Sequence, residues 1–366
     1  MVTSEQTGKP CVAIVDSDPS RRSQAAGCLS SFYQLTEYAD PSNAMVRSRG
    51  NIPRLMLVGE KLAAGGGFEF VRGLQLDPIL ATIPILMLVA RSDKATRDGV
   101  VQCGAKNFLT WPSPRRALVT AVSGLLNRRV EREWQTLHAM PRQALSGTLK
   151  LFNGIANSIG NGEPILYQAV SNACQPVVES IASNDFKDIL HAVRDYDDYT
   201  FAHSIRVATY LALFGSNLGL SRDEQVILAS GGLLHDIGKM TISHALLNKP
   251  GRLDAAEFAV MRGHVDASVR YLLACPDLPK GIVDIAAQHH ERLDGSGYPL
   301  GLAGNELNRL ARMASIIDVF SALTDRRVYK PPMTAEDALA LMVDEMASHL
   351  DLKLLGLFRQ MLLDAT

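Results

Sequence analysis

The chain has 366 residues, of which 47% are apolar and 20% charged, so its composition supports packed cores and excludes a disordered protein. That length favours two domains rather than one. Lys and Arg number 37 against 38 Asp and Glu, and this even balance gives no reason to expect direct nucleic-acid binding. The longest apolar runs, 52–58 and 83–90, are far shorter than the ~20 residues that span a bilayer, so we expect no membrane segment.

The cysteines and the N-terminus indicate a cytoplasmic protein. The five cysteines are scattered, odd in number and never form a CxxC pair, which argues against a disulfide scaffold and against a thiolate zinc site. Residues 1–10 are polar and lack the charged and apolar regions of a signal peptide.

Residues 11–128 alternate short apolar segments with helical ones. The predicted strands are 11–16, 34–38, 55–58, 85–89 and 107–109, and the predicted helices include 19–30, 67–75 and 94–103. Apolar strands separated by helices indicate βαβ units, so we expect an α/β fold with a doubly wound, parallel, five-stranded sheet. Functional groups of such sheets gather at the carboxyl ends of the strands.

This stretch resembles a response-regulator receiver domain through "VDSDPSRR", "PRLMLV", "IPILMLVARSD" and "GAKNFLTWPSP". The resemblance implies an acidic pair, an Asp that accepts phosphate, a hydroxyl residue and a Lys. Asp16 keeps one acid, but the other positions hold Ser17, Gly59, Val89 and Trp111. Glycine cannot form an acyl phosphate, so we predict no phosphorylation, with a shifted nucleophile at Glu60 as the alternative. A degenerate receiver of this kind would serve dimerisation, partner binding or structure alone.

A helical linker is predicted between this domain and the rest. Apolar residues recur at helical spacing from Arg115 to about Met140, so one long helix could pair with its copy in a homodimer or pack on its own domain. Four glycines within 146–164 predict a break. The predicted organisation is residues 1–128 as the receiver-like domain, 129–164 as the linker and 165–366 as an all-α domain.

The all-α part carries residues suited to metal binding. Ser221 with Glu224, and Asp254 with Glu257, have the spacing of capping boxes at helix N-termini. His203 continues an apolar helical stripe and should point inward. The candidate ligands are five histidines and two aspartates: His203, His235, Asp236, His264, His289, His290 and Asp318. Burying them without partners would be costly, and metal ions remove that cost. Nitrogen and oxygen ligands without thiolates suit Fe, Mn, Zn or Co.

These residues lie in motifs that resemble the HD-GYP family of cyclic-di-GMP phosphodiesterases. The motifs are "GGLLHDIGKM", "LLNKPGRL", "HHERLDGSGYP" and "IIDVFSALTDRRVYK", and they span about residues 190–350. The resemblance implies an HD-superfamily helical bundle and hydrolysis of cyclic di-GMP to pGpG, and often onward to GMP. It also implies that the loop with Tyr298 shapes the substrate site and contacts GGDEF-domain partner proteins.

The resemblance also assigns roles to single residues. His203, His235, Asp236 and Asp318 would hold one metal, and Asp236 would bridge to a second metal held by His264, His289 and His290. Fe or Mn is favoured, with Zn, Co or Ni as alternatives. Lys239 would contact the scissile phosphate as part of the catalytic set, and Arg327, Lys330 and Tyr298 would contact substrate. Tyr199 stands where some members carry a Glu for a third metal, and this favours two ions.

The implied mechanism is attack on phosphorus by a hydroxide that bridges the two metals, with Lys239 offsetting charge on the phosphoryl oxygens. Ser321 replaces a substrate-contacting Asp of the family, which motivates an alternative function as a slow or inactive sensor and scaffold. A third hypothesis is a different HD-type phosphohydrolase. The adjacent pair His289–His290 and the loop that contains Gly297, Tyr298 and Pro299 favour the cyclic dinucleotide as the substrate.

Overall fold

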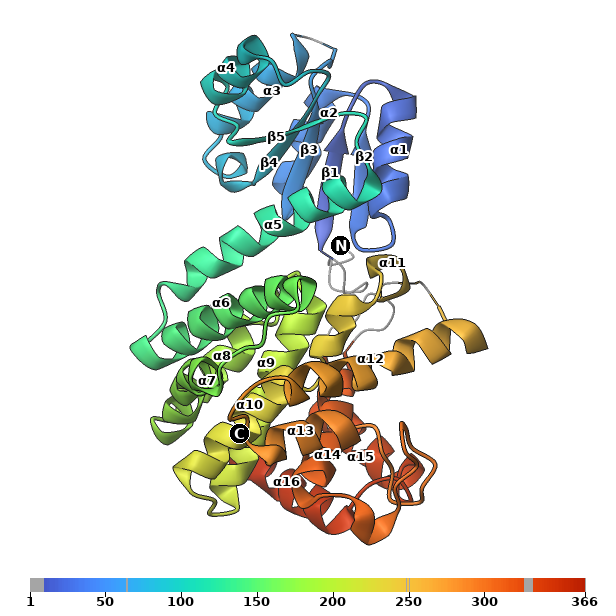
Figure 1. Ribbon diagram of the computed structural model, residues 1–366. Helices are drawn as coiled ribbons and strands as arrows, with labels where there is room; N and C mark the ends of the chain where they lie inside the picture. Colours follow the sequence, from blue (N-terminus) through green and yellow to red (C-terminus); the bar gives the residue numbers. More distant parts are fainter. Residues whose placement is uncertain (1–9, 64, 248, 250, 326–331, 366) are drawn as a thin grey trace. The chain divides into compact units, whose positions relative to one another are not determined.

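A computed structural model describes residues 10–63, 65–247, 249, 251–325 and 332–365 (Figure 1). The chain divides into two compact units, the first ending at Arg129 and the second beginning at Val130. Over these described residues, none of the helices is long and apolar enough to cross a membrane.

The first unit is built on the predicted five-stranded parallel sheet. Its strands are β1 (Cys11–Val15), β2 (Gln34–Tyr38), β3 (Leu55–Gly59), β4 (Ile85–Val89) and β5 (Asn107–Thr110), in the order β2-β1-β3-β4-β5. The helices between and after them are α1 (Pro19–Leu29), α2 (Pro41–Gly50), α3 (Gly66–Gln75), η1 (Leu80–Thr82), α4 (Lys94–Gln102) and α5 (Arg115–Trp134). The α/β prediction is confirmed.

Alternate residues of the central strands cover the two faces of this sheet. Met56 and Val58 of β3 pack with residues of α2, α3 and α4 on one face. Leu55 and Leu57 of the same strand pack with residues of α1 and α5 on the other face. Burial of both faces explains why β3 and β4 consist of continuous apolar residues.

The second unit is helical. Its elements are α6 (Ala139–Asn161), α7 (Tyr167–Ala182), α8 (Phe186–Ala192), α9 (Tyr199–Asn217), α10 (Arg222–Leu234), η2 (Ile237–Thr241), α11 (His244–Leu247), α12 (Ala255–Leu273), α13 (Lys280–Gln288), η3 (Gly304–Glu306), α14 (Arg309–Thr324), α15 (Ala335–Glu345) and α16 (Leu352–Ala365). Both predicted capping boxes are present, at the starts of α10 and α12.

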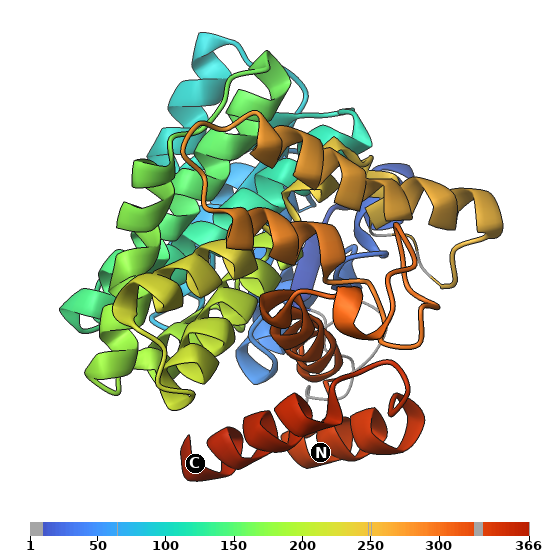
Figure 2. The same ribbon diagram turned by 60° about the horizontal axis from the view of Figure 1, so that its bottom comes forward.

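Helix α9 contributes to both apolar cores of this unit. Its residues Ile205 and Ala208 pack with α6, α7 and α10, whereas Val207, Leu211 and Phe214 pack with α14, α15 and α16. Figure 2 shows α15 and the C-terminal helix α16 at one end of the unit. Because α9 is buried on both sides, His203 in its first turns is fixed in the interior, as its apolar stripe predicts.

The linker prediction is wrong in two places. The predicted long helix ends at Trp134 and α6 begins at Ala139, so the interruption falls before the glycines rather than among them. The region 146–164, predicted as a break, is helical as far as Asn161. Glycine costs about 1 kcal/mol in a helix interior, but buried Leu145, Phe152 and Ile155 of α6 pack into a core, and that packing outweighs propensity. Gly162 ends the helix with a left-handed φ of 72°.

Candidate metal centre

The predicted ligands come together inside the second unit from separate helices. His203 lies on α9, His264 on α12 and Asp318 on α14. His235 and Asp236 directly follow α10, and His289 and His290 directly follow α13. All are buried except His290, whose side chain is 25% exposed.

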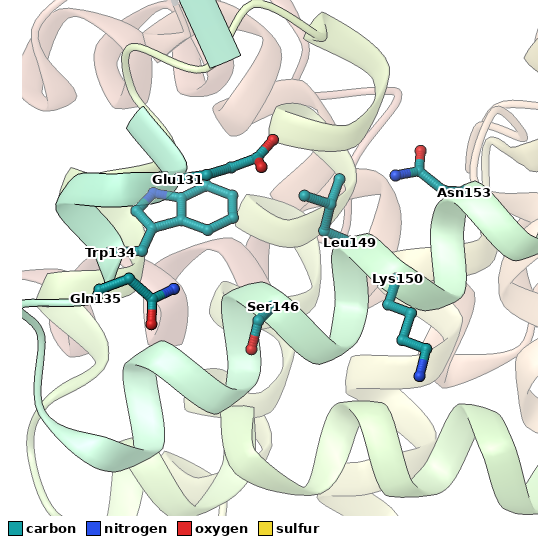
Figure 3. A pocket seen from close by; sticks show the side chains of 7 residues that line it. All are labelled: Glu131, Trp134, Gln135, Ser146, Leu149, Lys150 and Asn153. Atoms are coloured by element: carbon teal, nitrogen blue, oxygen red, sulfur yellow. The ribbon is translucent and has the colours of Figure 1, made fainter. Parts of the chain in front are cut away.

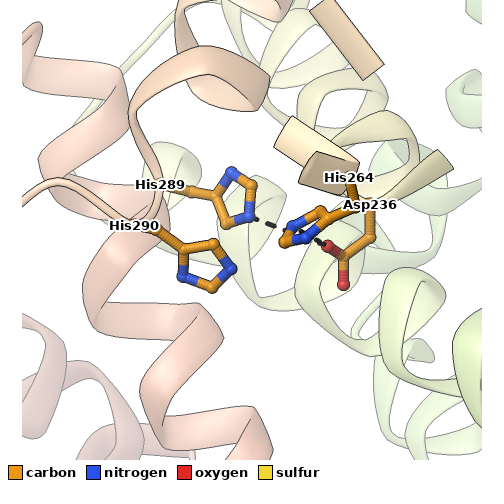
Figure 4. Close-up of side chains that lie close together, drawn as sticks. All are labelled: Asp236, His264, His289 and His290. Atoms are coloured by element: carbon orange, nitrogen blue, oxygen red, sulfur yellow. Dashed lines mark ion pairs between the residues drawn. The ribbon is translucent and has the colours of Figure 1, made fainter. Parts of the chain in front are cut away.

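Asp236 faces three histidines of the cluster, and Figure 4 shows its ion pairs with His264 and His289. Its Oδ1 is 3.1 Å from Nε2 of His264 and 3.7 Å from Nε2 of His289. Its Oδ2 is 3.2 Å from Nε2 of His235. The two carboxylate oxygens of one residue therefore face different histidines.

Asp318 forms a second point of convergence. Its Oδ1 is 2.8 Å from Nε2 of His203 and 3.9 Å from Nε2 of His235, and its Oδ2 is 3.9 Å from Nδ1 of His290. Two groups of donor atoms lie within 4.8 Å of one another: Asp236, His264, His289 and His290 in one, and His203, His235 and Asp236 in the other. Asp236 belongs to both groups.

Three of the imidazoles are oriented by their own local backbone. Nδ1 of His235 is 2.7 Å from the carbonyl of Gly232, Nδ1 of His264 is 2.7 Å from that of Met261, and Nδ1 of His289 is 3.0 Å from that of Ala286. A carbonyl accepts only, so Nδ1 must carry the proton in each ring. Nε2 then presents its lone pair to the cluster, the arrangement found in metal-binding histidines.

The inward atoms of the cluster lack hydrogen-bond partners. Nε2 of His235, His264 and His289 and Oδ1 of Asp236 are buried without one. Buried polar groups are normally paired, because each unpaired group costs free energy. Several imidazole lone pairs converging on a carboxylate are satisfied together by a divalent cation, so the donor set fits the metal ions that the motifs imply.

The electrostatics of the centre favour ionised carboxylates. Burial acts to raise the pKa of Asp236, but the charges of His235 and Lys239 hold it well below its usual range. Burial acts in the same direction on Asp318, but the hydrogen bond from His203 and the electrostatic attraction of the surrounding histidines together outweigh it, so that pKa is also well below its usual range.

The histidine pKa values move in both directions. Burial lowers the pKa of His289. Burial and the neighbouring His289 together hold the pKa of His290 well below its usual range. For His235 burial also acts downward, but the adjacent Asp236 carboxylate outweighs it and raises the pKa. Neutral His289 and His290 beside ionised aspartates match the protonation that metal coordination requires.

Lys239 projects from η2 to the edge of the cluster. Its ammonium group pairs with Oδ2 of Asp236 and its side chain is 21% exposed. The neighbouring Gly238 allows η2 to pack directly on α12, since a Cβ there would lie 2.0 Å from the carbonyl oxygen of His264. The ammonium group of Lys239 is thus held beside the predicted ligands while its side chain stays partly exposed to solvent.

The GYP loop (residues 294–299) borders the cluster. The Tyr298 ring lies 4.7 Å from the ring of His290, and the Tyr298 N–H donates to the His290 carbonyl at 3.2 Å. Gly297 sits where a Cβ would be 2.5 Å from the backbone of Glu291, so only glycine fits. Buried Glu291 accepts N–H groups of Leu300 and Leu302 at 2.7 and 3.0 Å and fixes the loop.

Sequence reasoning missed one buried carboxylate near the centre. Asp325 is 6% exposed, and its Oδ2 lies 3.9 Å from Nδ1 of His203. Arg206 follows His203 by three residues on α9. Its Nε lies 3.7 Å from Oδ1 of Asp325, and its guanidinium donates to the hydroxyl of Thr324. Asp325 follows Asp318 by seven residues, two helical turns, and this spacing is the signal that could have identified it.

Other predicted positions have different outcomes. Arg327 and Lys330, predicted to contact substrate, lie outside the described residues. The Tyr199 ring stacks on His203 with centroids 5.6 Å apart and a 17° angle. Ser321 is fully buried, and its hydroxyl has no hydrogen-bond partner among the described residues.

In the first unit, β3 ends in a glycine at the position where the receiver resemblance implies a phosphate-accepting Asp. Gly59 ends β3, and a Cβ there would lie 2.2 Å from Oδ2 of buried Asp16. The other oxygen of Asp16 accepts from Arg21 at 3.0 Å. Glu60 accepts the N–H of Ala90 at 2.8 Å, so its carboxylate is already used within the fold.

A pocket of about 390 Å³ lies elsewhere in the second unit, between the end of α5 and α6 (Figure 3). It contains none of the predicted ligands. Its lining residues are Glu131, Trp134, Gln135, Ser146, Leu149, Lys150 and Asn153.

Comparison with known proteins finds a family match within the second unit. Residues 186–354 match the family model of the HD domain. The match contains every one of the predicted ligands.

Particular relatives extend the comparison. The chain is 29% identical over 334 residues to the cyclic di-GMP phosphodiesterase response regulator RpfG of Xanthomonas campestris pv. campestris, covering 90% of this chain and 82% of RpfG. It is 40% identical over 150 residues to the cyclic di-GMP phosphodiesterase PA4108 of Pseudomonas aeruginosa, covering 40% of this chain and 36% of that protein. It is 38% identical over 153 residues to the 3′3′-cGAMP-specific phosphodiesterase 3 of Vibrio cholerae, covering 42% of this chain and 33% of that protein.

The chain thus spans about one third of the length of PA4108 and of the 3′3′-cGAMP-specific phosphodiesterase 3, and most of the length of RpfG. The match to RpfG runs through both units. The resemblance inferred from the motifs, a receiver-like domain followed by an HD-type domain, is confirmed.

Proposed function

We propose that the chain is a metal-dependent phosphodiesterase that hydrolyses cyclic di-GMP to linear pGpG, with GMP as the product of a second cleavage. The observation that carries this proposal is the convergence of unpaired imidazole Nε2 atoms on Asp236 beside Lys239. The HD-domain match and the phosphodiesterase relatives support the reaction class.

Two divalent ions are proposed, with Fe or Mn favoured and Zn, Co or Ni as alternatives. His203, His235, Asp236 and Asp318 would hold one, and Asp236, His264, His289 and His290 the other. The two donor groups that share Asp236 support this division. Bound ions would supply Lewis-acid activation of water and of the phosphoryl group.

The remaining steps fall to the protein's own side chains. Lys239 would bind a non-bridging oxygen of the scissile phosphate and offset its developing charge. Tyr298, fixed by its contacts with His290, would orient the substrate. In the reaction a water oxygen bonds to phosphorus, the bond from phosphorus to the 3′ oxygen breaks, and a proton passes to that oxygen. The roles of Arg327 and Lys330 as substrate contacts remain part of the proposal.

The first unit is proposed to be a pseudo-receiver that controls the HD domain without being phosphorylated. Gly59 and the engaged carboxylates of Asp16 and Glu60 support this view. Residues 1–128 would form this domain, 129–164 the helical linker and 165–366 the catalytic domain. Homodimer formation, a GGDEF-domain partner at the GYP loop and a cytoplasmic location are further parts of the proposal.

Two observations favour alternative functions. The partnerless hydroxyl of Ser321, in place of the family's substrate-contacting Asp, favours a slow sensor and scaffold. The relative named for 3′3′-cGAMP favours a different cyclic dinucleotide as the substrate.

One assay separates these functions. Purified chain loaded with Mn²⁺ or Fe²⁺ is incubated with cyclic di-GMP or 3′3′-cGAMP, and the products are resolved by chromatography. Turnover of cyclic di-GMP to pGpG supports the proposal, and preferential turnover of 3′3′-cGAMP reassigns the substrate. Binding without turnover selects the sensor, and neither binding nor turnover refutes the proposal in favour of a different HD-type phosphohydrolase.

A further inference from the structure

An arginine beside the metal centre has no assigned role. Arg262 lies on α12 two residues before His264, and its side chain is exposed. Its guanidinium carbon lies 4.5 Å from the centre of the Tyr298 ring. Among the described residues, no carboxylate lies within ion-pair distance of this guanidinium.

Tyr298 connects this arginine to the candidate metal centre. The same ring that Arg262 contacts lies 4.7 Å from the imidazole of His290, a proposed metal ligand. Tyr298 also donates its backbone N–H to the carbonyl of His290. A single aromatic ring therefore separates the Arg262 guanidinium from the ligand cluster.

A second aromatic side chain borders the same place. Phe258 precedes Arg262 by four residues, which places both on one face of α12. The Phe258 ring is 6.3 Å from that of Tyr298 at an angle of 78°, and the residue is 46% exposed. The rim of the centre thus combines a cation with exposed aromatic surface.

This combination suits a phosphate with an adjoining nucleoside. A guanidinium held against an aromatic face keeps its in-plane N–H donors free, and those donors match two phosphate oxygens. Aromatic side chains provide surfaces on which nucleobases stack. Lys239 is assigned to the scissile phosphate, so the second phosphate of a cyclic dinucleotide needs a different cation, and the exposed Arg262 is one beside the centre.

We propose that Arg262 binds the phosphate of the cyclic dinucleotide that is not being hydrolysed, with Tyr298 holding the guanidinium and Phe258 bordering the same subsite. This inference rests on the proposed function, because it names a contact for the substrate of that centre. Arg262 is a substrate-binding residue in this scheme and has no part in holding the ions.

The test compares two substrates on the full-length, Mn²⁺-loaded chain. Cyclic di-GMP has two phosphates, whereas bis(p-nitrophenyl) phosphate has one diester and nothing to occupy the second site. The variants are Arg262→Ala, Arg262→Lys and the control Arg270→Ala, which removes an exposed arginine from the same helix. For each we measure kcat, KM and bound manganese.

Arg262→Ala is expected to raise KM for cyclic di-GMP about 10- to 100-fold, the range for one lost charge-assisted contact, with a much smaller change in kcat. Its preference for cyclic di-GMP over the small diester should fall by the same factor. Arg262→Lys should recover part of this loss, and Arg270→Ala should match the wild type.

Three results would overturn the inference. One is a KM for Arg262→Ala within about twofold of the wild-type value. The second is an equal rise in KM for both substrates, and the third is a loss of bound manganese. Either of these two results indicates a structural role. If the wild type binds cyclic di-GMP without turnover, the same shift is expected in Kd. If it neither binds nor hydrolyses it, the proposed function fails first and this contact fails with it.

Discussion

Removal of Asp236 is expected to differ in kind from removal of any one histidine. Asp236 faces His235 with one oxygen and His264 and His289 with the other. If it bridges two ions, Asp236→Ala should lose both, whereas His264→Ala should lose only one. Elemental analysis of desalted protein measures the number of ions per chain.

The activity loss can be estimated from the role of the ions. An ion that polarises a phosphoryl oxygen supplies several kcal/mol of transition-state stabilisation, and about 4 kcal/mol corresponds to about a thousandfold in rate. His264→Ala should therefore lower kcat for cyclic di-GMP about a thousandfold, and Asp236→Ala should lower it further. Chromatography of the products gives the rates.

The control variant is His191→Ala, which removes an exposed histidine on α8 outside the cluster. It should keep wild-type ion content and kcat. The shared-ligand reasoning is refuted if Asp236→Ala retains one tightly bound ion, or if His264→Ala retains both. Wild-type turnover in Asp236→Ala would refute the catalytic assignment itself.

Three further predictions concern stability and the first unit. Hydrogen bonds from the backbone and from Arg49 lower the pKa of Asp77 in the folded state. Ionised Asp77 therefore stabilises the fold fully above the unfolded-state pKa near 3.8, and this stabilisation is lost as pH falls through the folded-state pKa. Urea unfolding should show Asp77→Asn destabilised at pH 6, with the deficit shrinking at pH 3. Glu291→Ala should lose about 2–4 kcal/mol by leaving two loop N–H groups unpaired, while Glu291→Gln loses less. Labelled acetyl phosphate should leave no acyl phosphate on the wild type or on Gly59→Asp, where Asp16 fills the space for a side chain.

The sequence was sufficient for most of the fold because its signals are local and strong. Strands β3 and β4 are continuous apolar runs, which are typical of a parallel sheet covered on both faces. The stripe that includes His203 has helical spacing, and both capping boxes are legible as short motifs. These patterns need no knowledge of distant contacts.

Other features depend on contacts between distant residues and could not be predicted. Packing of Phe152 and Ile155 outweighs the low helix propensity of the glycines of α6, so the break that these glycines predict is absent. The contact between Arg262 and Tyr298 joins α12 to a loop 36 residues later, and no spacing rule connects them.

The backbone contacts of His235, His264 and His289 have a consequence for how the centre responds to change. Each ring is tied to a carbonyl one turn earlier in its own helix, so the ring and that helical segment move as one body. A remote substitution that tilts a helix is expected to shift the Nε2 atom of a proposed metal ligand without turning its imidazole ring. Across a library of core variants, the measured metal affinity is therefore expected to fall as the displacement of these helices increases.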